Sequence, residues 1–68
     1  MEDNIEWPGL LGEDRRTAEA FLREANSALA IVVIPEGSPV TCDFRLDRVR
    51  LFVDQETKTI IVHIPRIG

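Results

Sequence analysis

The chain has 68 residues, a formal net charge of −4 at pH 7 and 44% hydrophobic residues. A chain of this length forms one domain, and such a domain buries only about 60% of the surface that its unfolded form exposes. The acidic balance argues against general nucleic-acid binding, which needs a basic face to neutralise phosphates. Because a small-molecule pocket would take up much of so small a core, these properties favour a function carried by the surface.

Three further exclusions follow from cysteine usage and from the apolar runs. One cysteine, Cys42, permits no internal disulfide. The longest apolar run, residues 29–35, is too short to span a bilayer, so no membrane partner is expected. Residues 1–7 are acidic and lack the basic start and apolar centre of a signal peptide, so we expect none in this chain. The sequence leaves the compartment, secreted or cytosolic, open.

The first half of the chain predicts a tail and then a helix. Residues 1–6 are expected to be a flexible tail, and residues 7–68 one folded domain with Trp7 as a core anchor. Asp14 is a plausible N-cap for a helix from Arg15 to about Asn26. Apolar residues at positions i, i+3, i+4 and i+7 predict its buried face. They are Ala18, Phe21, Leu22 and Ala25.

The second half predicts three strands. Residues 31–34 are a β-branched run that favours a strand buried on both faces, hence central in a sheet. Residues 45–53 alternate, so that Val49, Leu51 and Val53 share one face while Arg48, Arg50 and Phe52 share the other. A polar turn over residues 54–59, expected to lie far from the loop and given no function, leads to a last strand over residues 60–64. A helix preceding the strands predicts a small α+β fold of two layers.

Residues 35–44 contain two prolines and a glycine and carry no helix or strand pattern. Connections this long in a compact domain are usually functional. Pro39 has a fixed φ, and the β-branched Val40 and Thr41 are stiff, so the segment is suited to add as an extended strand to a partner. Proteases bind their substrates in this way. The sequence therefore predicts a displayed, substrate-like loop.

The arginines that follow the loop suggest how it is held. Arg48 and Arg50 leave the same face of their strand, from which they can hydrogen-bond Thr41, Asp43 and loop carbonyls. A loop held in this way loses little entropy on binding. The alternative from composition, an ordinary solvated face with these arginines paired to Asp43, Asp47 or Asp54, stays open at this point.

Four stretches of the chain together resemble one family. They are WPGLLG (7–12), IPEGSPVT (34–41), DFRLDRVRLFVD (43–54) and VHIPRIG (62–68). They are similar to the potato inhibitor I family of serine protease inhibitors. The resemblance implies a wedge in which a single helix packs on a small mixed parallel and antiparallel sheet. It also implies a long exposed reactive loop joining the two parallel strands.

The resemblance also implies the site, over loop residues 37–46. The reactive bond would be Cys42–Asp43, and loop support would come from Thr41, Asp43, Arg48, Arg50 and Gly68. The residues expected to contact the protease are Ser38, Pro39, Val40, Thr41, Cys42, Asp43, Phe44 and Arg45. Neither a cofactor nor a metal is implied.

Cysteine is unusual at the specificity position of such a loop. Because its side chain is small, moderately apolar and without a cation, it suits subtilisin-, chymotrypsin- or elastase-like serine proteases and not trypsin. The expected state is a monomer. Oxidation of the exposed thiol would allow a dimer linked through Cys42.

The residues also allow other functions to be compared with inhibition. A cysteine hydrolase would need Cys42 and His63 in contact, together with a third orienting group. A metal site needs three or four ligands, and one cysteine with one histidine falls short. An RNA patch at residues 45–50 is opposed by Asp43 and Asp47. A non-inhibitory interaction module on the same fold remains the alternative function.

Overall fold

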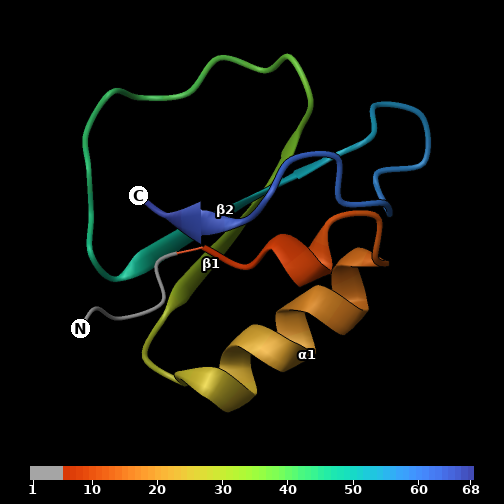
Figure 1. Cartoon of the computed structure of the whole chain (residues 1–68). Helices are drawn as coiled ribbons and strands as arrows, with labels where there is room; N and C mark the ends of the chain where they lie inside the picture. Colours follow the sequence, from red (N-terminus) through yellow and green to blue (C-terminus); the bar gives the residue numbers. More distant parts are fainter. Residues whose placement is uncertain (1–5) are drawn as a thin grey trace.

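The computed structural model describes residues 6–68 and has a helix on one side of a small sheet. Its elements are η1 (Pro8–Leu10), α1 (Arg15–Ala25), β1 (Ala30–Pro35), β2 (Arg48–Val53) and β3 (Arg66–Ile67). α1 covers one face of the sheet, and the chain between β1 and β2 arcs over the other side (Figure 1). The predicted two-layer α+β fold is confirmed. No helix among residues 6–68 is long and apolar enough to cross a membrane.

α1 begins and ends where the sequence predicts. The Asp14 side chain caps the helix by accepting a hydrogen bond from the Arg16 amide at 2.8 Å, which satisfies one of the free N–H groups of the first turn. Asn26 is the C-cap, and its own amide donates to the Leu22 carbonyl at 2.9 Å. The predicted N-cap and helix are therefore confirmed.

The buried face of α1 is narrower than predicted. Ala18 and Leu22 are fully buried, whereas Phe21 is 50% exposed and Ala25 is also exposed. A three-stranded sheet presents only one short row of inward side chains, so it covers a single i, i+4 ridge of the helix. The prediction that Phe21 and Ala25 belong to the core is wrong.

β2 supplies the centre of the core by strict alternation. Its burial alternates along the strand, with Val49, Leu51 and Val53 at 0% exposure. The buried cluster is completed by Leu10, Ala18, Leu22 and Ile61, and Trp7 packs against it as the sequence predicts. Because successive side chains of a strand point to opposite faces, Arg48, Arg50 and Phe52 are directed away from this core.

β1 lies at the edge of the sheet and not at its centre. The strand order is β1-β2-β3, with β1 parallel and β3 antiparallel to β2, so the predicted mixed sheet is confirmed. Val32 and Val33 remain 40% and 36% exposed. A β-branched run reflects strand propensity, whereas burial on both faces needs neighbours that a domain of this size does not have. The prediction of a central β1 is wrong.

The C-terminal segment forms its strand later than predicted. Ile60 and Ile61 make isolated bridges to Asp14 and Val53, and the paired strand is β3, Arg66–Ile67. Pro65 has no amide hydrogen, so it interrupts any ladder that starts at Ile60. The predicted strand over residues 60–64 is therefore wrong, and the predicted strand start at residue 45 is three residues too early.

The N-terminal end of the described chain is tied to β3. Glu6 forms an antiparallel bridge with Arg66, whose guanidinium donates to the Glu6 carboxylate at 3.2 Å. Glu6 therefore belongs to the fold and not to the predicted tail. The remainder of that tail, residues 1–5, lies outside the described residues.

The parallel pairing of β1 with β2 accounts for the long connection. Ala30 pairs with Arg48 and Pro35 with Val53, so the chain leaves β1 at one end and must return to the other end before β2 begins. A strand of this length spans on the order of 20 Å, and residues 36–47 provide more than enough chain for the return. This connecting loop (residues 36–47) consequently bows outward over the sheet (Figure 1).

Which face of α1 is buried can be tested by comparing substitutions at two neighbouring residues. Leu22→Ala removes a fully buried side chain and should lower the free energy of unfolding by about 2–5 kcal/mol. Phe21→Ala, at a half-exposed position on the same helix, should cost less than half as much. Urea unfolding measures both, and equal losses would contradict the observed face.

Candidate functional site

The connecting loop places the expected contact residues on the surface. Among the residues expected to touch a protease, Ser38 is half-buried and the others are exposed: Pro39, Val40, Thr41, Cys42, Asp43, Phe44 and Arg45. Phe44 is 68% exposed and Leu46, beyond it, is 77% exposed. Large apolar side chains that are this exposed do not pack into the core of the domain and are available to bind a partner.

Arg50 rises from β2 to the crest of the loop. Its Nη2 group donates to the Thr41 hydroxyl at 2.9 Å and to the Thr41 carbonyl at 3.1 Å, and it lies 3.6 Å from the Asp43 carboxylate. The Arg50 side chain is only 18% exposed. Charge-assisted bonds in so sheltered a place are stronger than bonds between neutral groups and are less screened by salt.

Arg48 binds the loop on the other side of Cys42. It donates to the Asp43 carbonyl at 3.0 Å, and its Nη1 lies 3.2 Å from the Asp43 carboxylate. Its Nε donates at 2.8 Å to the carbonyl of Gly68, whose own amide donates to the Arg48 carbonyl at 2.9 Å. The structure thus brings together Thr41, Asp43, Arg48, Arg50 and Gly68, the five residues expected to support the loop.

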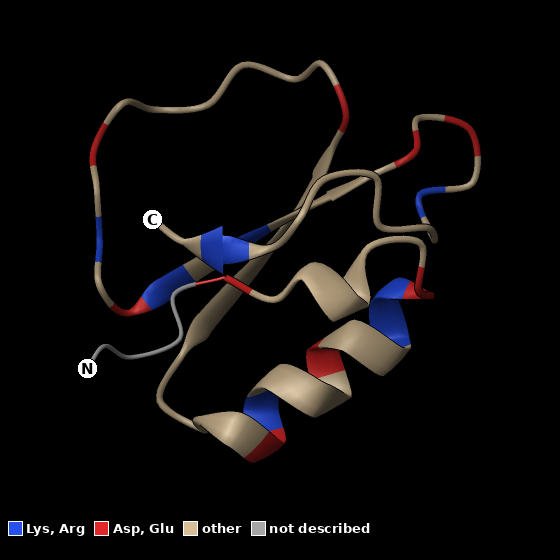
Figure 2. Ribbon diagram, in the orientation of Figure 1, with Lys and Arg blue, Asp and Glu red and all other residues tan. Residues whose placement is uncertain are grey.

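Basic residues on β2 lie beneath a loop that carries acidic residues (Figure 2). The alternative of an ordinary solvated face expected Arg48 and Arg50 to pair with Asp43, Asp47 or Asp54. Asp43 does pair with both arginines. Asp47, however, pairs with Arg45 at 3.0 Å, and Asp54 accepts hydrogen bonds within its own turn. Arg48 and Arg50 also bind loop carbonyls, which an ordinary solvated face would not do.

Two further contacts hold the loop, and only the second of them has no signal in the sequence. The Arg45 amide donates to the Gly68 carbonyl at 3.4 Å, so the C-terminus lies under the loop. Gln55, in the turn after β2, donates to the Glu36 carbonyl at 2.6 Å. The expectation that this turn lies far from the loop is wrong. A single polar residue 19 positions away along the chain gives no pattern from which such a contact could be read.

The two residues of the hydrolase alternative are not joined. His63 lies edge-on to Phe52 at 5.3 Å and 3.4 Å from the Glu36 carboxylate, and no hydrogen bond within residues 6–68 involves Cys42. Cys42 is a free, exposed thiol. In this same part of the chain, no group of three or more possible ligands is gathered that could hold a metal ion.

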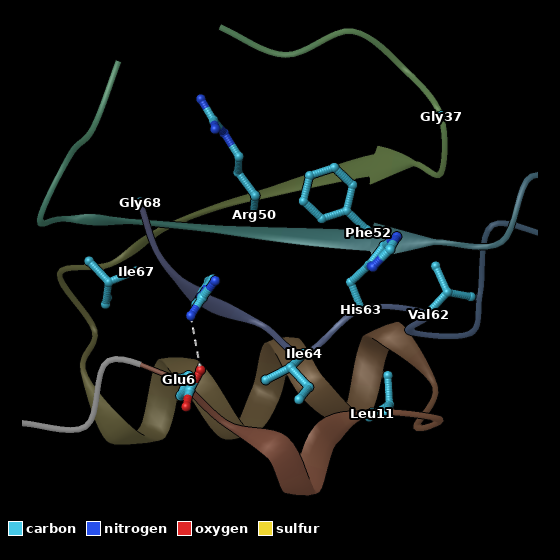
Figure 3. Close-up of a pocket in the computed structure, with 11 residues that line it drawn as sticks. Glu6, Leu11, Gly37, Arg50, Phe52, Val62, His63, Ile64, Ile67 and Gly68 are labelled. Atoms are coloured by element: carbon cyan, nitrogen blue, oxygen red, sulfur yellow. Dashed lines mark hydrogen bonds and ion pairs between the residues drawn. The ribbon is translucent and has the colours of Figure 1, made fainter. Parts of the chain in front are cut away.

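An open hollow of about 670 Å³ lies on the loop side of the sheet. Arg50 and Phe52 point into it from β2, and His63 and Gly37 border it (Figure 3). Because it lies outside the core cluster, it takes no volume from the packed interior. The site is therefore a surface feature built on the face of the sheet that α1 leaves free.

The fold and the site together define a small α+β domain that displays a loop bound from below by two arginines. A family model described as the potato inhibitor I family matches residues 2–68. The chain belongs to this family, whose members are protease inhibitors and not enzymes.

Named relatives agree with this assignment. The "Inhibitor of trypsin and hageman factor" of Cucurbita maxima is 40% identical over 91% of this chain and 88% of its own length. "Subtilisin inhibitor CLSI-I" of Canavalia lineata is 42% identical over 91% of both chains. The crystal structure of bitter gourd trypsin inhibitor superposes with a TM-score of 0.86 at 36% identity, covering 98% of this chain and 96% of the other.

The electrostatics of the loop can be tested at Asp43. Hydrogen bonding from the Thr41 hydroxyl, and the charge of Arg48, lower the pKa of the Asp43 carboxyl from its ordinary value of 3.8. A carboxyl with a lowered pKa contributes its stabilisation above the ordinary value and loses it as pH falls through the lowered one. The bonds of Asp43 should therefore hold above about pH 4 and be lost in stronger acid.

Thr41→Val and Arg48→Ala should each raise the pKa of Asp43 toward 3.8, as measured by a carbon-detected NMR titration of the carboxyl group. Asp47 is the internal control, because its pKa is lowered by Arg45 and should stay low in Thr41→Val. An unchanged Asp43 titration in both variants would contradict the assigned contacts.

Proposed function

We propose that the chain inhibits serine proteases of the subtilisin, chymotrypsin or elastase type by presenting loop 37–46 as a substrate, with Cys42–Asp43 as the reactive bond. The observation that carries the proposal is the position of the two arginines. Arg50 binds Thr41, the residue before Cys42, and Arg48 binds Asp43, on the other side of the bond. Both sides of one exposed peptide bond are therefore tied to the same strand.

The chemistry of inhibition follows from this arrangement. The partner's serine attacks the Cys42 carbonyl with its histidine as base, and the bond to the Asp43 nitrogen breaks as that nitrogen takes the proton. In an ordinary substrate the amine then leaves and water attacks the acyl group. Here Arg48 holds the Asp43 amine beside the acyl carbon, so the amine attacks again and the serine leaves. Religation in place of hydrolysis keeps the protease occupied.

Preorganisation supplies the affinity. Arg48 and Arg50, whose side chains are only 14% and 18% exposed, already bind Asp43 and Thr41 in the free protein, so the loop needs little further ordering when the protease arrives. Little further conformational entropy of the loop is then lost on binding, so the same contact area gives a higher affinity.

The support role can be tested by removing each arginine. Arg48→Ala and Arg50→Ala should each be cleaved at Cys42–Asp43 at least about tenfold faster by subtilisin, because each loses two or more charge-assisted hydrogen bonds. Mass spectrometry of timed mixtures measures the cleavage. Arg66→Ala is the matched control, since Arg66 is 69% exposed and pairs with Glu6. Unchanged cleavage and inhibition in both loop variants would refute the support role.

The identity of the specificity residue can be tested with trypsin, whose pocket carries an aspartate. The unmodified protein should inhibit trypsin weakly or not at all, and Cys42→Arg should gain trypsin inhibition, because residue 42 is exposed and free to change. Val40→Arg, which puts the same cation on an exposed residue two positions earlier, should not gain it. Strong trypsin inhibition by the unmodified protein would contradict the assignment of Cys42.

A non-inhibitory interaction module on the same fold is the second candidate. The feature that favours it is the exposed Phe44 and Leu46 pair, which a partner other than a protease could bind. Titration against subtilisin, chymotrypsin and elastase distinguishes the two, since a module would inhibit none of the three while keeping its folded loop.

A further inference from the structure

The two ends of the loop are held by different groups. Arg48 and Gly68 bind the C-terminal arm of the loop, which we define as residues 43–47, and Arg50 binds Thr41, next to the crest at Cys42. None of these three binds the first residues of the N-terminal arm (residues 36–41), where the chain leaves β1. That arm carries the residues on the acyl side of the proposed reactive bond, so its root needs an anchor of its own.

The root of the N-terminal arm is a tight turn at Gly37. Gly37 has φ +87°, a left-handed value that favours glycine, and the Ser38 amide closes the turn on the Pro35 carbonyl at 3.1 Å. The Glu36 amide donates to the Val53 carbonyl at 2.7 Å, so the backbone of residue 36 is tied to β2. These bonds set the direction in which the arm leaves the sheet.

Gln55 closes over this turn from the neighbouring strand connection. Its amide Nε2 donates to the Glu36 carbonyl at 2.6 Å. A Cβ atom built on Gly37 would lie 3.0 Å from the same nitrogen, so the Gln55 amide packs directly against the backbone of the turn. The contact is therefore both a hydrogen bond and a close packing contact.

The turn that carries Gln55 is held by several hydrogen bonds of its own. The Asp54 carboxylate accepts from the Thr57, Thr59 and Ile60 amides at 2.8–3.0 Å and also from the Thr57 hydroxyl. These donors, with the Ile60 and Thr57 amides foremost, hold the pKa of Asp54 well below its usual range, so it stays ionised and hydrogen-bonded even when the medium is moderately acidic. A turn held by these hydrogen bonds can keep the Gln55 side chain in a fixed position.

We propose that Gln55 is a positioning residue for the reactive bond, acting through the Glu36 carbonyl and the Gly37 turn; this rests on the proposed inhibitory function. After cleavage the acyl group on Cys42 is attached to the domain only through the N-terminal arm and the Thr41–Arg50 bonds. Gln55 limits the swing of that arm. It thereby keeps the acyl carbon within reach of the Asp43 amine, which Arg48 holds.

The test compares two variants with one control from the same turn. Gln55→Ala removes the side-chain amide, and Gln55→Glu keeps its size but replaces the donor with a carboxylate oxygen. Glu56→Ala alters the next, exposed residue, for which no side-chain hydrogen bond is found within residues 6–68. Urea unfolding of each variant checks that the fold is retained.

Two measurements report on the role. Amide hydrogen exchange in the free protein should rise at Ser38 by about two- to twelvefold in both Gln55 variants, the range that one neutral hydrogen bond supplies. It should be unchanged at Arg45, whose amide binds Gly68. In mixtures with subtilisin, cleavage at Cys42–Asp43 should accelerate by a similar factor, while the association rate constant stays nearly unchanged. Glu56→Ala should match the unmodified protein throughout.

Three results would overturn the proposal. Unchanged exchange at Ser38 in both variants would show that Gln55 does not hold the arm. Faster exchange without faster cleavage would show that the arm does not position the bond. A Gln55→Glu variant that behaves as the unmodified protein would show that the hydrogen bond is not the operative contact. If the unmodified protein inhibits no protease, the proposed function fails and the positioning role with it, but exchange at Ser38 still decides whether Gln55 anchors the arm.

Discussion

The site depends on two guanidinium groups that project from one strand to both sides of one exposed peptide bond. Arg50 reaches Thr41 at 2.9 Å, and Arg48 reaches the Asp43 carbonyl at 3.0 Å. Arginine suits this task because its planar fork bonds a carbonyl, a hydroxyl and a carboxylate from one position, whereas lysine offers a single point charge. With no disulfide available to a chain with one cysteine, such noncovalent bonds hold the loop in shape.

β2 links the stability of the domain to the geometry of the loop. On one face it buries Val49, Leu51 and Val53 under α1, and on the other it supplies Arg48, Arg50 and Phe52. The parallel pairing with β1 adds the reason that a loop exists at all, because the chain must return along the sheet before β2 can start. One strand therefore positions the core, the loop and its supports.

The local features of this fold were predictable, and the relations between distant segments were not. The Asp14 cap and the alternation from Arg48 to Val53 are set by nearest neighbours and by the period of each element, so the sequence predicts them correctly. The place of β1 in the sheet depends on how many strands surround it, which no local pattern encodes. The contact between Gln55 and Glu36 joins two residues of ordinary type across 19 positions, and only the folded chain shows it.

The partial exposure of the arginines explains how a domain this small can hold three charged side chains, Arg48, Arg50 and Asp43, together with several carbonyls in one cluster. Full burial of a guanidinium and a carboxylate would cost several kcal/mol of desolvation per ion, on the order of the whole stability of such a domain. At 14% and 18% exposure Arg48 and Arg50 keep some hydration, while Asp43, at 50%, keeps more. The cluster therefore orders the loop without a large desolvation cost, and it stays open to a protease that must reach the bond between residues 42 and 43.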